Sequence, residues 1–244
     1  MELTLADNLV LEMKNIEKDY YGNKVLKGID IKLAPGEVHA IVGENGAGKS
    51  TLMNILFGMP VIKNTGGFSG DILFNGQKEK INSPKRAMAL GIGMVHQEFM
   101  LIPGFTITEN IKLNREITTP NVISRLFGNK LESLDFNKMN QDAREALDIL
   151  GLAVNELSLI SGLPVSYMQF VEIAREIDKD NIKVMVFDEP TAALTEDDAE
   201  TLMEAMNKIT ETGISIIFIS HRLDEVLRVS DRITVIRDGE MVGK

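Results

Sequence analysis

The sequence contains no cysteine among its 244 residues. This absence excludes disulfide bonds and thiolate metal sites, and it is typical of a chain that stays in a reducing compartment such as the cytoplasm. A chain of this length with 44% apolar residues is able to bury a substantial core without cross-links. The composition fits one large α/β domain or one domain that carries a subdomain.

A secretory signal and a long apolar run are also missing. The first ten residues, MELTLADNLV, place no basic residues ahead of the apolar ones, so we do not expect a signal peptide. The longest apolar run, residues 214–219, includes one serine and is far shorter than the roughly 20 residues that cross a bilayer. We therefore expect any role at a membrane to depend on a partner.

The sequence has no excess of positive charge. Its formal net charge is -10, and no basic stretch compensates for it. Because nucleic-acid phosphates are bound mainly by lysine and arginine, the sequence predicts no nucleic-acid partner.

Two patterns in the first third of the chain predict antiparallel strands. Ile29, Ile31 and Leu33 alternate with charged residues, as in a half-exposed strand. The segment GDILFNGQ, residues 70–77, predicts a strand that ends in a hairpin turn at Asn75-Gly76.

Four other runs are almost continuously apolar, which is typical of strands that are buried on both faces of a parallel sheet. They are VHAIV at 38–42, GIGMV at 91–95, KVMVF at 183–187 and ISIIFI at 214–219. Helical patterns cover residues 51–57, 142–150, 167–177 and 197–210. The sequence therefore predicts a parallel sheet with helices on its faces.

The middle of the chain shows helical and loop patterns but no clear strand. We therefore expect a helical subdomain at residues 98–176, inserted into a core formed by residues 1–97 and 177–244. The polar segment 116–137 is interpreted as a surface connection.

The segment GENGAGKST, Gly43 to Thr51, fits the phosphate-binding pattern G-x-x-x-x-G-K-[ST]. It lies between the buried strand VHAIV and the predicted helix TLMNILF, which is the context that such a loop requires. Backbone amides would surround a β-phosphate, Lys49 would reach the β- and γ-phosphates, and Ser50 would ligate Mg²⁺. A glycine-rich turn without function is the alternative.

A second candidate group is VMVFDEP, residues 184–190. Asp188 closes a buried strand, where its carboxylate could reach Mg²⁺ through water, and Glu189 follows it in position to polarise an attacking water. The alternative is an acidic pair that caps a helix, and the phosphate-binding loop in the same chain makes this less favoured.

Two more polar residues follow buried strands. His221 comes just after ISIIFIS, at the edge of the sheet where phosphates must lie, and could contact a γ-phosphate, although a lone histidine is more often structural. Gln97, after GIGMV, could ligate Mg²⁺ or position water. His39 and His96 are interpreted as ordinary residues of the sheet or its edge.

The chain resembles the nucleotide-binding subunit of an ATP-binding cassette (ABC) transporter over essentially its whole length. The segments that carry this resemblance, in this order and spacing, are GENGAGKS, Gln97 in MVHQE, VEIAR, VMVFDEPTAALT and His221. The phrases MVHQEFMLIPGFTITENI, DEPTAALT and ISHRLDEV resemble the sugar-importing branch, whose ATPase is a single chain with two such halves. The sequence is similar to the first half. The resemblance implies an α/β fold: a RecA-like P-loop NTPase core with an antiparallel β subdomain and a helical subdomain.

The resemblance also implies roles for individual residues. Tyr20 would stack on adenine, with Tyr21 as an adjacent rival and a surface tyrosine as the alternative. Glu189 would be the catalytic base, Gln97 the Q-loop residue and His221 the switch histidine. ATP would be held by the Walker A loop, with Mg²⁺ at Ser50, Gln97 and Asp188; the loop residues are Gly43, Asn45, Gly46, Ala47, Gly48, Lys49, Ser50 and Thr51.

The segment LPVSYMQFVEIAR, residues 163–175, departs from the family pattern. The family has a sequence close to LSGGQ here, whose amides bind the γ-phosphate of ATP held by the opposite half. Alignment puts Pro164 on the serine, Val165 and Ser166 on the glycines and Tyr167 on the glutamine. The proline removes a hydroxyl and an N–H, and the two added Cβ atoms lie where a phosphate must approach. We expect this degenerate signature to face the partner's ATP but to bind it weakly.

Ser166 and Gln169 have the spacing of a capping box, so the helix is expected to begin near Tyr167 with Ser166 as its cap. A plain capped core helix is therefore the alternative interpretation of the segment.

The resemblance implies an ATPase half that energises import of a sugar or related small polar solute. Its partners would be a second nucleotide-binding half in the same longer chain, an integral membrane permease and, indirectly, an external solute-binding protein, at the cytoplasmic face of the membrane. Two alternatives are a regulatory half that binds ATP with little turnover, and a non-transport member of the same family.

Overall fold

The computed structural model describes residues 9–95, 100–121, 124, 132–192 and 194–243. The chain forms two compact units. Unit 1 is Met1–Gln97 with Asp180–Lys244, and unit 2 is Glu98–Lys179. The sequence places the return to the core at residue 177, whereas unit 1 resumes at Asp180.

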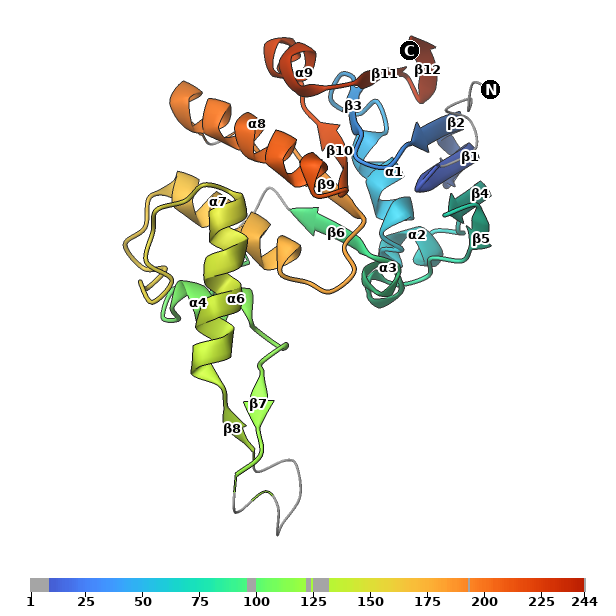
Figure 1. Cartoon of the computed structure of the whole chain (residues 1–244). Coiled ribbons are helices and arrows are strands. Elements are labelled where there is room, and N and C mark those ends of the chain that lie inside the picture. Colours follow the sequence, from blue (N-terminus) through green and yellow to red (C-terminus); the bar gives the residue numbers. More distant parts are fainter. Residues whose placement is uncertain (1–8, 96–99, 122–123, 125–131, 193, 244) are drawn as a thin grey trace, which may run out of the picture. The chain divides into compact units, whose positions relative to one another are not determined.

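The first sheet of unit 1 is antiparallel, with the strand order β2-β1-β4-β5 (Figure 1). Its strands are β1 Leu11–Tyr20, β2 Asn23–Leu33, β4 Ser69–Phe74 and β5 Gln77–Glu79. Ile29, Ile31 and Leu33 are fully buried, so the predicted alternation is confirmed. Asn75-Gly76 joins β4 to β5 with positive φ at both residues, as the predicted hairpin turn requires.

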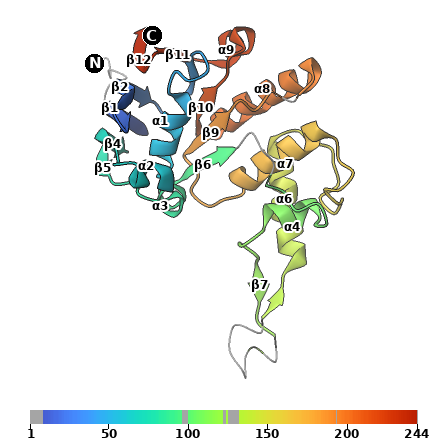
Figure 2. The same ribbon diagram turned by 180° about the vertical axis from the view of Figure 1, so that it is seen from behind.

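The second sheet of unit 1 has the order β12-β11-β3-β10-β9-β6. All neighbours are parallel except β12, which pairs antiparallel with β11 at the sheet edge. The strands are β3 Val38–Val42, β6 Ile92–Val95, β9 Val184–Asp188, β10 Ser215–Ile219, β11 Arg232–Arg237 and β12 Glu240–Gly243. The four apolar runs thus form the predicted parallel sheet, seen from both sides in Figures 1 and 2.

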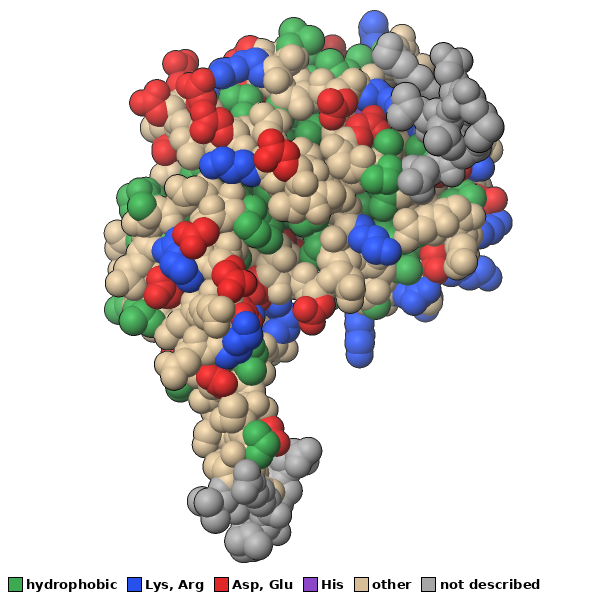
Figure 3. Space-filling view, viewed as in Figure 1, with side chains coloured by type: hydrophobic (Ala, Val, Ile, Leu, Met, Phe, Trp, Pro, Cys, Tyr) green, Lys and Arg blue, Asp and Glu red, His purple; other side chains and the backbone are tan. Residues whose placement is uncertain are grey.

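The helices of unit 1 are α1 Lys49–Leu56, α2 Pro60–Asn64, α3 Pro84–Leu90, α8 Glu196–Glu211 and α9 Leu223–Val229. Helix α1 buries Leu52 and Leu56 in a hydrophobic cluster that contains side chains of both sheets. Helix α8 begins at the cap Thr195, with three acidic residues in its first turn. Acidic side chains gather over this helix in Figure 3.

Unit 2 is built on α4 Ile107–Ile111, α6 Phe136–Ile149 and α7 Val165–Ile177, which pack on one another. Lys112, at the end of α4, is 5% exposed, and its Nζ lies 2.7 Å from carboxylate oxygens of both Asp142 and Asp178. This buried network ties the three helices together, because Asp142 lies on α6 and Asp178 caps α7.

Two short strands in unit 2, β7 Thr118–Thr119 and β8 Ser133–Leu134, form an antiparallel pair that the sequence does not predict. All four of their residues are exposed, so these strands lack the buried alternating side chains by which a strand is recognised. No helix in the described ranges is long and apolar enough to span a bilayer.

Candidate functional site

The loop that joins β3 to α1 requires glycine at two positions. A Cβ on Gly43 would lie 2.2 Å from the carbonyl oxygen of Ile236, because β11 runs directly beside the loop. Gly48 has φ +107, and a Cβ there would lie 2.6 Å from a side-chain carbon of Leu26. A Cβ on Gly46, by contrast, would meet no atom of the described residues within 4 Å. The loop is therefore packed at both ends and accessible at its tip.

Lys49 lies at the start of α1 and is 6% exposed. Its Nζ donates hydrogen bonds to the carbonyl oxygens of Gly43 at 2.7 Å and Glu44 at 3.1 Å. The ammonium group is thus folded over the loop, within reach of any anion that the loop amides hold.

The loop lines a pocket that also receives a residue from the far end of the sequence. Its lining residues are Val25, Asn45, Gly46, Gly48, Lys49, Ser50, Thr51 and Glu189. The structure therefore brings the predicted base Glu189 to the predicted ATP-binding loop. Gly43 and Ala47 support the loop instead, Gly43 against β11 and Ala47 in the hydrophobic cluster.

Asp188 is the last residue of β9, and Glu189 follows it with φ +49. The Glu189 amide donates to the carbonyl oxygen of Ile219, the last residue of β10, at 2.9 Å. His221 follows two residues later, and its Nδ1 lies 3.4 Å from Oε1 of Glu189. The pairing of β9 with β10 thus brings the two predicted catalytic side chains together at the carboxyl edge of the sheet.

Gln97 and His96 lie outside the described residues. His39 is buried in β3, with Nδ1 at 2.9 Å from Lys32 O and Nε2 at 2.8 Å from Thr234 Oγ1. It is a structural residue of the sheet, as the sequence predicts.

Tyr20 ends β1 and packs against the hydrophobic cluster. The Nζ of Lys18 lies 4.4 Å from the centre of its ring and donates to the carbonyl oxygen of Thr65 at 2.7 Å. Lys18 is only 1% exposed, and burial lowers the pKa of its ammonium despite the nearby Asp19.

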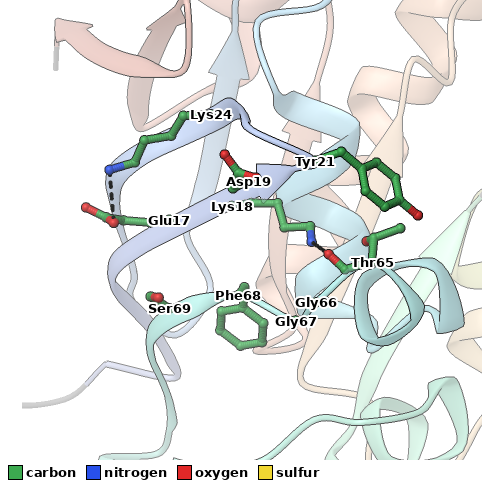
Figure 4. Close-up of a pocket in the computed structure, with 10 residues that line it drawn as sticks. All are labelled: Glu17, Lys18, Asp19, Tyr21, Lys24, Thr65, Gly66, Gly67, Phe68 and Ser69. Atoms are coloured by element: carbon green, nitrogen blue, oxygen red, sulfur yellow. Dashed lines mark hydrogen bonds and ion pairs between the residues drawn. The ribbon is translucent and has the colours of Figure 1, made fainter.

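Tyr21 is 91% exposed and lines a different pocket, shown in Figure 4 beside Lys18 and the glycines 66 and 67. In the described part of the chain, the antiparallel sheet contributes Val25 to the P-loop pocket and neither tyrosine is among the lining residues. Stacking of Tyr20 on adenine stays a prediction.

The prediction that Ser166 caps α7 is wrong. The helix begins at Val165, its N-cap is Pro164 with φ −57, and no side chain caps it. The helix therefore begins before Ser166, which is 8% exposed within the first turn. No capping box forms, because the N-cap is Pro164, which has neither a hydroxyl nor an N–H.

Val165 and Tyr167 are 41% and 38% exposed, and Pro164 is also exposed. Three of the four residues of the degenerate signature therefore lie at the surface, and only Ser166 points inward.

The sequence does not identify Val25 as a lining residue of the P-loop pocket, and it does not single out the buried Glu225 near His221. Val25 reaches the P-loop pocket from β2, and no local pattern marks this contact because it depends on how the two sheets pack. Glu225 lies four residues after His221 in the first turn of α9, and its position so close to a candidate site residue is the signal that could have identified it.

The family model for ABC transporters matches residues 26–192, which is more than half of the chain. This chain belongs to the ABC transporter family. The predicted family and the predicted fold class are thereby confirmed.

Two curated relatives in this family are similar over nearly the whole chain. The ribose import ATP-binding protein RbsA of Bacillus cereus is 43% identical over 96% of this chain and 44% of its own length. The galactose/methyl galactoside import ATP-binding protein MglA of Clostridium tetani is 38% identical over 98% of this chain and 45% of its own length. The chain thus spans less than half the length of these ABC proteins.

Solved ABC cassettes share the fold. The ADP conformation of an ATP-binding cassette of an ABC transporter superimposes with a TM-score of 0.80 at 27% identity, covering 97% of this chain and 90% of that one. A nucleotide-free cassette gives a TM-score of 0.79 at 26% identity, with the same coverage.

Proposed function

We propose that this chain is an ATP-binding and ATP-hydrolysing half that energises import of a sugar or related small polar solute through a membrane permease. The observation that carries the proposal is that Glu189 lines the same pocket as Lys49 and Ser50, with His221 3.4 Å from its carboxylate. A phosphate-binding loop, a base and a polar orienting group are the parts that phosphoryl transfer to water requires.

ATP would bind with its phosphates in the loop 43–51. The backbone amides of this loop and the N-terminus of α1 offer positive partial charge to the phosphates. Lys49 would exchange its hydrogen bonds to the carbonyls of Gly43 and Glu44 for bonds to phosphate oxygens. Tyr20 is proposed to stack on adenine. The solved ATP-binding cassette in its ADP conformation, which shares this fold, supports the proposal that this chain binds a nucleotide.

Mg²⁺ would be held by Ser50 and Asp188, with Gln97 as a further proposed ligand. No group of three or more acidic or histidine side chains that could hold a metal occurs in the described residues. One hydroxyl and one carboxylate fit Mg²⁺, which prefers oxygen ligands and binds through few protein groups plus phosphates and water. When bound, the ion neutralises negative charge on the phosphates.

Hydrolysis would use Glu189 as the general base. Its carboxylate would accept a proton from the water that attacks the γ-phosphate, and the left-handed backbone at Glu189 fixes where the carboxylate points. His221, whose side chain is 58% exposed, would orient this carboxylate and reach the γ-phosphate.

A second nucleotide-binding half, in the same longer protein, would complete the site. The P-loop, Asp188, Glu189 and His221 would then work with the signature of the partner half. The opposite site would use residues 163–167 of this chain, and the dipole at the start of α7 contributes only about 0.3–1 kcal/mol to phosphate binding without the missing amide and hydroxyl. We therefore propose one active and one weak site.

The permease would dock on unit 2, on the cytoplasmic side of the membrane. Two segments lie side by side there, because Ile160 N donates to Phe105 O at 3.0 Å and Ser161 N donates to Pro103 O at 2.9 Å. They expose Phe105, Leu157 and Leu159 at 38%, 55% and 52%. Figure 3 shows apolar side chains on the outer edge of this unit. Contiguous exposed apolar surface of this kind is typical of protein interfaces.

The solute class rests on the relatives that import ribose and galactosides. An external solute-binding protein would deliver the solute to the permease and would not touch this chain. The second candidate functions are a regulatory ATP-binding half and a non-transport ATPase. Co-purification with a membrane permease would distinguish the transport function from that of a non-transport ATPase.

Glu189→Gln tests the hydrolytic function. In the protein that contains both halves, we expect at least about a hundredfold slower hydrolysis with unchanged ATP affinity, because the amide cannot accept the proton. Unchanged turnover would favour the regulatory function. The isolated chain should hydrolyse ATP much more slowly than the two halves together, and equal rates would contradict the proposed asymmetry.

A further inference from the structure

Glu225, in the first turn of α9, is 2% exposed and holds three polar partners. Thr191 Oγ1 donates to its Oε2 at 2.7 Å, and Ser220 Oγ lies 3.4 Å from the same oxygen. The Nη1 of Arg222 lies 2.7 Å from Oε1. One buried carboxylate therefore contacts two separate segments of the chain, by hydrogen bonds at Oε2 and by an ion pair at Oε1, which accepts no hydrogen bond among the described residues.

These two segments also carry Glu189 and His221, the pair of predicted catalytic residues. Thr191 lies two residues after Glu189, while Ser220 and Arg222 flank His221 in the sequence. The Arg222 amide also donates to Ser220 Oγ at 3.0 Å, so the backbone on both sides of His221 is joined to the Glu225 carboxylate.

The Glu225 carboxylate does not act as a cap of its own helix, since α9 begins without a side-chain cap and the contact with its N-cap residue Arg222 is to the guanidinium group. Burying a carboxylate is costly, and a well-packed apolar residue would stabilise the fold as well or better. Hydrogen bonds from fixed donors, by contrast, define the relative position of the groups that carry them.

We propose that Glu225 is a positioning residue that sets the register between the Glu189 and His221 segments. Its bond to Thr191 fixes the turn after Glu189, and its contacts with Ser220 and Arg222 fix the turn around His221. The 3.4 Å approach of the two side chains depends on this shared carboxylate. The inference rests on the proposed function only in that the aligned pair performs hydrolysis.

Thr191→Val and Thr191→Ser form the decisive matched pair. Valine has nearly the shape of threonine but no hydroxyl, whereas serine keeps the donor. In the protein with both halves, we expect Thr191→Val to lower kcat about tenfold, equivalent to about 1.4 kcal/mol, and to change ATP affinity less than about twofold. Serine should retain most of the wild-type kcat. Equal loss in both variants, or no loss in valine, would overturn the proposal.

Glu225→Gln, with Asp224→Asn as control, tests the carboxylate itself. Asp224 is an exposed neighbour in the same turn, so its substitution should leave kcat unchanged, while Glu225→Gln should lower kcat without weakening ATP binding. Failure of Glu225→Gln to fold would leave the threonine pair to decide.

Hydrogen exchange separates this inference from the proposed function. The amides of Arg222 and Leu194, bonded to Ser220 Oγ and Thr191 O, should exchange faster in Thr191→Val than in Thr191→Ser, whatever the rate of hydrolysis. Unchanged exchange would overturn the positioning role. A different result would reject only the proposed function: if exchange rises in Thr191→Val as expected but hydrolysis is insensitive to Glu189→Gln, the positioning role stands and Glu189 is not the base.

Discussion

Glu189 and His221 face each other across the ends of two neighbouring parallel strands, with Oε1 of the glutamate 3.4 Å from Nδ1 of the histidine. The backbone brings the two segments to the same edge of the sheet. Asp188 pairs with Ile219, and the amide of Glu189 bonds to the Ile219 carbonyl, so both side chains follow closely on the ends of paired strands. Glu189 reaches this position only with φ +49, which an L-residue adopts at a cost.

His221→Ala should slow hydrolysis by about tenfold to a hundredfold, because the carboxylate of Glu189 loses the side chain that orients it. The combination with Glu189→Gln should be little slower than Glu189→Gln alone, since residues that act as a unit do not contribute additively. Steady-state rates of the single and double variants in the protein with both halves measure this. Losses that simply multiply would show that the two residues act independently.

Glu189→Gly should be more stable than Glu189→Ala by about 1 kcal/mol, because glycine adopts positive φ without the Cβ penalty. Urea unfolding of the isolated chain gives the difference. At the exposed Glu204, in the middle of α8, the order should reverse, with alanine better by about 1 kcal/mol. If alanine is more stable than glycine at position 189 as well as at position 204, the backbone of Glu189 is not strained.

Much of unit 1 could be predicted from the sequence because its signals are local. Uninterrupted apolar runs are recognisable without knowing their neighbours, and the P-loop pattern needs only a strand before it and a helix after it. The order of the strands is not local, and neither is the contact of Val25 with the P-loop pocket, because both depend on packing between segments far apart in the sequence.

The start of α7 shows a different limit. Ser166 matches a capping pattern, but the helix begins one residue earlier, at Val165, with Pro164 as its N-cap, so a preferred cap residue does not by itself mark the start of a helix. Similarly, the exposed strands β7 and β8 pair without any buried side chain, so their hydrophobic periodicity does not predict them.

Glu172→Gln should gain stability relative to the wild type as the pH rises. Burial in α7 raises the pKa of Glu172, although Arg175 and the amide of Met100, at 2.6 Å, oppose this. The unfolded chain therefore loses this proton first, and the wild type loses stability from about pH 4.5 up to the raised pKa. Unfolding free energies across this range measure the trend.

Asp142→Asn should show the opposite trend and serves as the control. Burial opposes the shift, but hydrogen bonds from Lys112 and Lys138 hold the pKa of Asp142 below its usual value. The advantage of the wild type over Asp142→Asn is present above pH 3.8 and is lost as the pH falls through the lowered pKa. Parallel trends for the two variants would contradict both assignments.

Restoring the signature should let the isolated chain dimerise on ATP. Serine at Pro164 would supply both a hydroxyl and an amide, and glycines at Val165 and Ser166 would remove two Cβ atoms from the path of a phosphate. Serine at the N-cap would also stabilise α7 by about 1 kcal/mol, which offsets part of the cost of two glycines in its first turn. We expect the triple variant to form an ATP-dependent dimer at lower protein concentration than the wild type, measured by sedimentation.

Adding Lys49→Ala should abolish this dimer, because the ATP that bridges the two copies is held by the P-loop. If the triple variant does not dimerise more readily, residues 163–167 are only the beginning of a core helix.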